Sequence, residues 1–168
     1  MKKMLLHVCC APCATYIIEK LSNNYKITLF FYNPNIMPKE EYEKRLLDVK
    51  KIAEYYNVNL LIGVYENDKF LVKIKGLEEQ EENSVRCLMC YQMRLLKTAE
   101  IAKEFDVFTT TLTISPYKDS DKINLLGSQI SDKFVAFDHK LEKGYEKSIE
   151  LSHKLNLYRQ KYCGCLFN

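Results

Sequence analysis

The chain has 168 residues, of which 47% are hydrophobic and 28% are charged, a composition typical of one globular domain with a hydrophobic core. Its formal net charge is +3, whereas a dedicated nucleic-acid-binding protein usually has a stronger basic bias; an enzyme that contacts one RNA loop needs only a local basic patch. The apolar runs are shorter than the roughly 20 residues of a transmembrane helix, so we expect no membrane partner. The first run ends at Cys9, too short for a secretion signal, which predicts a cytoplasmic protein.

The first part of the chain alternates apolar runs with helical patterns. In chain order, these predict a strand at residues 4–8, a helix over about 12–22, a strand at 27–32, a helix over 38–56 and a strand at 59–64. Pro12 and Pro38 both fit the first turn of a helix, where the missing N–H of proline has no intrahelical partner to lose. Residues 67–75 are expected to form a helix or a loop, and the acidic run 78–82 a solvated surface.

The second part of the chain continues this alternation. In order, it predicts a helix from near Cys90 to about 104, a strand at 107–112, a helix over 120–129, a fifth strand at 134–137 and a helix over 145–155. Strands that alternate with helices predict an α/β fold. We expect a doubly wound, mostly parallel sheet of about five strands with helices on both faces, Rossmann-like and three-layered. Residues 1–168 are interpreted as a single domain with a cysteine-bearing C-terminal tail.

The seven cysteines are the unusual feature of the composition. They form three groups: Cys9, Cys10 and Cys13; Cys87 and Cys90; and Cys163 and Cys165. In a chain without an export signal, clustered cysteines predict metal ligands or redox thiols, and an odd number cannot all form disulfides. The first group follows a predicted parallel strand, at the edge of the sheet where ligands bind in such folds. Backbone N–H groups at a helix start also stabilise thiolates, the metal-binding form of cysteine.

The number of cysteines favours an iron–sulfur cluster over a structural zinc ion, although soft thiolates suit both. A structural zinc ion takes four ligands, and seven cysteines exceed four by three. An iron–sulfur cluster also needs about four, which leaves Cys9, Cys13 or Cys165 for a neighbouring ion. All seven cysteines are therefore predicted metal ligands. All except Cys13 are candidates for the cluster, and Cys9 and Cys13 are also candidates for catalysis.

Other residues near the cysteines have alternative interpretations. Three arginines lie beside the second and third groups, namely Arg86, Arg94 and Arg159, and arginine binds phosphate or pairs with a carboxylate. Tyr91 and Tyr162 adjoin cysteine motifs and are candidates for substrate contact. His7 lies in an apolar run, which predicts a core residue or one that supports the ligands. Residues 109–111 are explained by β-propensity alone, whereas Ser115 follows the strand end and is a candidate to line the site.

Five segments, in order along essentially the whole chain, resemble motifs of the QueH family of epoxyqueuosine reductases. They are LHVCCAPC at 6–13, YNPNIMP at 32–38, RCLMCY at 86–91, FTTTL at 108–112, and LYRQ followed by YCGC within 157–165. One such match is weak, but five together are specific. The stretch 138–145 departs from the family pattern, because Lys140 or Lys143 stands where the family tends to have arginine.

The resemblance implies an oxidoreductase, and a metalloenzyme domain, that performs the last step of queuosine biosynthesis. In this step epoxyqueuosine at the wobble position of the tRNA anticodon loses its epoxide oxygen and becomes queuosine. The family is associated with a [4Fe-4S] cluster and an adjacent iron ion, and it does not use cobalamin. The implied partners are tRNA, through its anticodon loop, and an unidentified electron donor such as ferredoxin or flavodoxin.

The reaction consumes two electrons and two protons, and no side chain can supply the electrons. We expect the cluster to deliver electrons and a metal on a surplus cysteine to hold the epoxide oxygen as a Lewis acid. Tyr91, Tyr162 or Asp138 is expected to donate a proton. An anticodon loop also offers an unstacked nucleotide without melting of a duplex.

Three alternatives remain open at this point. A non-catalytic zinc module that binds RNA or protein predicts a colourless protein that unfolds on chelation. A thiol oxidoreductase using Cys10 and Cys13 predicts a metal-free protein with one cysteine of low pKa. A hydrolase of the ATP-pyrophosphatase type requires a Gly/Ser-rich phosphate loop after the first strand, where this chain has CCAPC.

Overall fold

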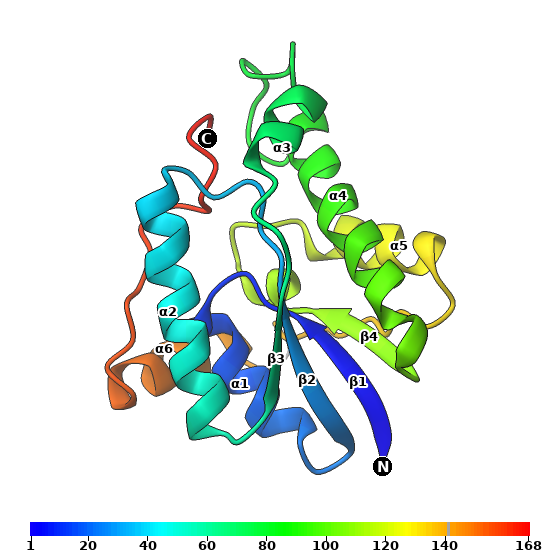
Figure 1. Cartoon of the computed structure of the whole chain (residues 1–168), viewed down its shortest axis with the longest axis vertical. Helices are drawn as coiled ribbons and strands as arrows, with labels where there is room; N and C mark the ends of the chain where they lie inside the picture. Colours follow the sequence, from blue (N-terminus) through cyan, green and yellow to red (C-terminus); the bar gives the residue numbers. More distant parts are fainter. Residues whose placement is uncertain (141) are drawn as a thin grey trace.

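The computed structural model describes residues 1–140 and 142–168, and in this part of the chain four parallel strands form one sheet (Figure 1). The strands are β1 (Lys2–His7), β2 (Tyr25–Phe31), β3 (Asn59–Ile62) and β4 (Val107–Thr110), in the order β3-β2-β1-β4. The predicted α/β class and parallel sheet are therefore confirmed. Because β1 pairs with both β2 and β4, it lies inside the sheet, and the chain crosses over in opposite directions on its two sides.

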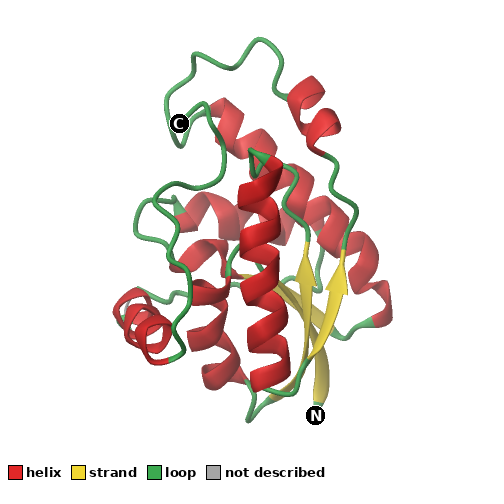
Figure 2. Ribbon diagram, turned by 60° about the vertical axis from the view of Figure 1, so that its left-hand side comes forward, coloured by secondary structure: helices red, strands yellow, loops and turns green. Residues whose placement is uncertain are grey.

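Helices cover both faces of the sheet (Figure 2). They are α1 (Ala11–Leu21), α2 (Lys39–Tyr55), α3 (Asn67–Lys73), α4 (Val85–Ile101), α5 (Ser120–Ile130) and α6 (Gly144–Lys154). One core, under α1, α2 and α6, contains Leu6 of β1, and the other, under α4 and α5, contains Leu5. Successive side chains of a strand point to opposite faces, so a strand covered on both faces is apolar throughout. This explains the continuous apolar run in β1.

The predicted fifth strand at residues 134–137 was wrong. This segment forms only an isolated parallel bridge between Phe134 and Phe108, in which Phe108 N donates to Lys133 O and Val135 N donates to Phe108 O. The neighbouring β4 is itself short, because residues 111–114 turn into a 3₁₀ helix instead of continuing the predicted strand. The segment therefore has only a short edge with which to pair.

Helix α4 begins at Val85, five residues before the predicted start at Cys90. Cys87 and Cys90 consequently both lie in its first two turns, and a spacing of three residues places them on one face of the helix. Within residues 1–140 and 142–168, no helix is both long and apolar enough to cross a membrane.

Replacement of Phe108 by alanine tests the core between β4 and helices α4 and α5. Phe108 has no exposed surface and packs edge-on against Phe134 at a ring-centroid distance of 5.5 Å. Phe108→Ala should lower the free energy of unfolding by about 3–5 kcal/mol, because truncation leaves a cavity in a packed core. Urea denaturation measures this change. The control Leu125→Ala, at an exposed position of α5, should shift it by no more than about 0.5 kcal/mol.

Candidate metal centre

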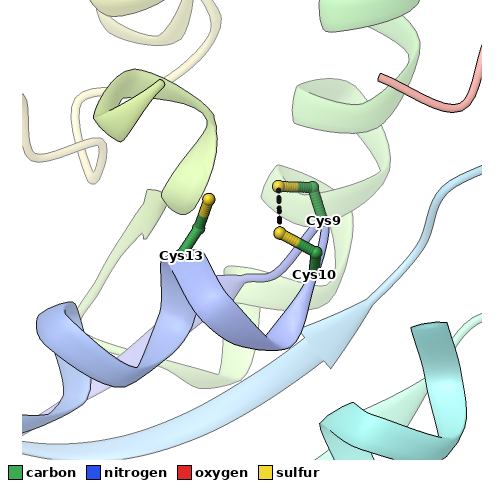
Figure 3. A group of neighbouring side chains, drawn as sticks. All are labelled: Cys9, Cys10 and Cys13. Carbon is green, nitrogen blue, oxygen red and sulfur yellow. Dashed lines mark hydrogen bonds between the residues drawn. The ribbon is translucent and has the colours of Figure 1, made fainter. Parts of the chain in front are cut away.

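Cys9, Cys10 and Cys13 form a compact group at the carboxyl end of β1 (Figure 3). Their three sulfur atoms lie within 4.8 Å of one another, and Cys9 Sγ is 3.8 Å from Cys10 Sγ. A tetrahedral ion with metal–sulfur bonds of about 2.3 Å holds its sulfur ligands about 3.8 Å apart. The group therefore has the dimensions of a three-cysteine site for a single ion, with one coordination position free for another ligand.

This first group lies between the loops that follow β1 and β4, and the C-terminal tail reaches it. Thr111, directly after β4, accepts a hydrogen bond from Cys9 N at 3.2 Å, and its hydroxyl lies 3.3 Å from Cys9 Sγ. Gln160 Nε2, in the tail, donates to Cys10 Sγ at 2.8 Å. The sequence explained Thr111 by β-propensity and did not single out Gln160 for the site. Their roles depend on contacts between residues more than a hundred positions apart.

The thiols of this group differ in pKa. Hydrogen bonds with the Cys10 and Cys13 thiols, opposed by burial, hold the pKa of Cys9 well below its usual value, and the nearby charge of Lys118 lowers it further. Hydrogen bonds with Cys10 and Cys9, together with burial, raise the pKa of Cys13. Cys9 is thus the first thiolate. Because a cation bound to all three sulfurs replaces the shared protons, this arrangement suits a metal ion.

The second and third cysteine groups of the sequence meet in space. Four cysteines line one cavity between the start of α4 and the tail: Cys87, Cys90, Cys163 and Cys165. Cys163 is partly exposed and the other three are buried. Four thiols from two segments are the ligand set that a [4Fe-4S] cluster requires. The residues of the cavity therefore fit such a group.

Arg94 supplies a fixed positive charge between the two sites. Its side chain is buried, and Nη2 donates to Cys90 Sγ at 3.2 Å. No ion pair within the described part of the chain joins Arg94 to a carboxylate. Burial lowers its pKa, but the nearby acidic groups of Cys90, Cys9, Tyr91 and Cys163 together raise the pKa by more, so the net shift is upward. A buried guanidinium stays charged and needs a counter-charge, which thiolates bound to a metal centre provide.

The tail that carries Cys163 and Cys165 is held by Arg45 of α2. Its guanidinium group donates from Nη1 to Cys163 O at 3.0 Å and from Nη2 to Tyr162 O at 2.9 Å, while Nε pairs with Glu41. Gly164, between the two cysteines, has a φ angle of +111°, and a Cβ atom there would lie 2.8 Å from Ile36 Cγ1. Only glycine fits this turn without strain.

Of the other two arginines, Arg86 is shielded from solvent and pairs with no carboxylate among residues 1–140 and 142–168. It is buried and donates to the carbonyl oxygens of Leu77, Glu78 and Gln80, and it also contacts Asn168 Oδ1. Arg86 therefore holds the loop before α4, where the sequence had left phosphate or carboxylate as partners. Arg159 is exposed in the tail.

An open cavity joins the two cysteine sites. Cys9 and Cys13 of the first group and Cys163 of the four-cysteine cavity line it together. Its wall includes Ser115, as the sequence predicted, and the further residues Tyr117, Lys118, Tyr145, Gln160, Lys161 and Tyr162. A substrate in this cavity would have sulfur atoms of both groups in front of it.

The structure brings two of the three predicted proton donors to the cysteines. Tyr162 lines the open cavity, and its hydroxyl donates to Met37 O. Tyr91 lines the four-cysteine cavity, and its hydroxyl donates to Asn83 Oδ1 at 3.3 Å. Burial raises the pKa of both phenols. Asp138 is exposed, accepts a hydrogen bond from Lys140 N, and is not among the described residues that line either cavity.

Two further expectations concern residues close to the site. His7 is buried, and its ring nitrogens lie 2.9 Å from Thr110 Oγ1 and 2.8 Å from Tyr32 O, so it contacts polar groups of neighbouring strands, as a core residue would. The stretch 138–145, which departs from the family pattern, includes Leu141, and that residue lies outside the described part of the chain.

Comparison with known proteins gives a consistent result. The family model described as "Epoxyqueuosine reductase QueH" matches residues 4–168. A Staphylococcus epidermidis protein with this name is 41% identical over 98% of this chain and 75% of its own length. A Streptococcus pyogenes protein of the same name is 39% identical over 98% of this chain and 69% of its own length. A Thermotoga maritima protein, also so named, is 37% identical over 100% of this chain and 91% of its own length.

The turn at Gly164 makes a testable prediction about metal binding. Gly164→Ala should lower the metal content after anaerobic reconstitution at least severalfold, because the added Cβ collides with Ile36 and displaces the flanking cysteines. Gly76→Ala is the matched control, since Gly76 also has a positive φ angle, +85°, but has no atom within 4 Å of the added Cβ. It should strain the backbone by about 1–3 kcal/mol and leave metal content unchanged. Equal metal contents in the two variants would contradict this role for the turn.

Proposed function

The chain belongs to the QueH family of epoxyqueuosine reductases, and from this premise we propose that it reduces epoxyqueuosine to queuosine in the anticodon of tRNA. One observation carries the proposal: seven cysteines gather into two groups that share an open cavity. A binding module would need only one such group. Two groups, one sized for a single ion and one with four thiols, suit redox chemistry on a bound substrate.

We assign the ligands by the geometry of the two groups. We propose that a [4Fe-4S] cluster is held by the four cysteines whose thiols line one cavity, the number of ligands that such a cluster needs: Cys87, Cys90, Cys163 and Cys165. Cys9, Cys10 and Cys13 are proposed to hold the adjacent iron ion, because their spacing suits one ion. This division moves Cys9 and Cys10 from the predicted cluster ligands to the ion.

Removal of the epoxide oxygen breaks two C–O bonds and leaves a C=C double bond, with two electrons and two protons consumed and one water released. The metal groups, when bound, would pass on two electrons from the electron donor and would provide a Lewis acid for the oxygen. Two residues of the chain place positive charge close to the cysteines. Arg94 keeps positive charge beside Cys90, and Lys118 keeps it near Cys9. Both charges stabilise thiolates and the oxygen that becomes negative as its bonds to carbon break.

Tyr162 is the proposed proton donor. It lines the open cavity beside Cys163, and burial raises its pKa, so the phenol is protonated at neutral pH. Tyr91 lines the four-cysteine cavity, and we assign it to the surroundings of the cluster.

The proposed reaction requires two macromolecular partners. A tRNA anticodon loop presents the reacting nucleotide, and a protein of the ferredoxin or flavodoxin class is the proposed electron donor. The cytoplasm is the proposed compartment, since a reducing environment keeps the cysteines available to metal.

The test begins with anaerobic reconstitution. The wild-type protein should contain about five irons and four sulfides per chain, and it should convert epoxyqueuosine to queuosine in tRNA, measured by mass spectrometry of the nucleosides. Cys87→Ala should abolish the visible absorption of the cluster. Cys9→Ala should keep that absorption and about four irons.

The rival functions predict other outcomes in the same experiment. A colourless protein that holds only zinc would support a binding module and overturn the reductase. A metal-free protein with one reactive thiol would support a thiol oxidoreductase. Loss of the cluster in Cys9→Ala would contradict the ligand division but not the activity.

Tyr162→Phe tests the proton donor. The variant removes one hydroxyl group, and kcat should fall by about 100-fold, the lower range for general acid catalysis. Tyr56→Phe is the control. The Tyr56 hydroxyl also donates a hydrogen bond, to Glu19, but Tyr56 follows α2 at the opposite end of the strands from the cysteines. Full turnover by Tyr162→Phe, with the cluster intact, would dismiss Tyr162 as the donor.

A further inference from the structure

Tyr117 has an exposed aromatic ring on the wall of the open cavity. It lies between the 3₁₀ helix after β4 and helix α5, and it lines the cavity together with Cys9 and Cys13. Its side chain is 70% exposed, the largest value for a tyrosine among the exposed hydrophobic residues of the described chain. The mechanism proposed above makes no use of it.

The backbone beneath this ring is held on two sides. Asn83 Nδ2, before α4, donates to Tyr117 O at 2.9 Å, and Tyr117 N donates to Ser115 Oγ at 3.3 Å. Tyr145, at the start of α6, meets the ring edge-to-face, with a centroid distance of 6.5 Å and an interplanar angle of 86°. Contacts from three segments therefore orient the ring while most of its surface remains open to solvent.

Positive charge surrounds the same cavity. Lys118 and Lys161 line it, and neither forms an ion pair with a carboxylate within the part of the chain that the structure describes. Glu82 is the acidic residue of this wall. An open aromatic face beside unpaired ammonium groups is the combination that binds single-stranded nucleic acid, where bases stack on the ring and phosphates meet the charges.

We propose that Tyr117 is a stacking platform for the nucleobase that neighbours the reacting nucleotide in the RNA loop, with Lys161 facing an adjacent phosphate. This inference rests on the proposed function, because it names how that RNA substrate is held. The reacting group has to reach the cysteine sulfurs inside the cavity. Tyr117, at the exposed wall, therefore meets the next base along the strand.

The test compares Tyr117→Ala with Tyr117→Phe. Binding of a fluorescent anticodon stem-loop RNA to the reconstituted enzyme is measured by anisotropy. Tyr117→Ala should weaken affinity about tenfold, within the range for loss of one stacked base, and Tyr117→Phe should stay within about twofold of wild type because the ring is kept. In turnover, the alanine variant should raise KM more than it lowers kcat.

The control is Tyr55→Ala. Tyr55 is also an exposed tyrosine, at 57%, and also meets a second tyrosine edge-to-face, but it ends α2 at the other edge of the sheet. It should bind RNA as the wild type does. Unchanged affinity in Tyr117→Ala, or an equal loss in Tyr117→Phe, would overturn stacking. Wild-type turnover is measured separately, so its failure would overturn the proposed function and not this comparison of RNA affinities.

Discussion

The parallel pairing of β1 with both of its neighbours is the constraint on which the rest of the site depends. Because the chain leaves β1 and β4 at the same edge and then turns to opposite faces, the two loops stay close but leave an opening between them. Cys9 occupies one side of this opening and Thr111 the other, and a hydrogen bond joins them. The cysteines of α4 and of the tail lie next to this end of the strands.

Three buried arginines, Arg45, Arg86 and Arg94, have different roles in the site. Arg45 and Arg86 donate mostly to backbone carbonyl oxygens and so position backbone segments, while Nε of Arg45 also pairs with the Glu41 carboxylate. Arg94 donates to Cys90 O and also to a sulfur atom, Cys90 Sγ, in the buried interior. Desolvation makes an unpaired charge costly there, so the positive charge and the anionic sulfur centre stabilise each other. The same residue type serves two physical purposes in one site.

Local patterns in the sequence predicted the strands, most of the helices and the three cysteine groups, because each depends on residues close together in the chain. The short edge of β4 did not show in the apolar pattern of residues 134–137, since propensity carries no information about available partners. The meeting of Cys87 and Cys90 with the tail was equally hidden. It depends on the contacts of Arg45 with carbonyl oxygens 117 and 118 residues away.

The anchored tail also sets an order of events during biosynthesis. More than seventy residues separate Cys90 from Cys163, and the ribosome extends the chain from its amino-terminal end. All four strands and the α4 cysteines leave the ribosome before the tail does. The four-cysteine cavity therefore gains its last two sulfur atoms only after residues 162–165 emerge, so the ligand set of this cavity is incomplete until synthesis reaches the tail.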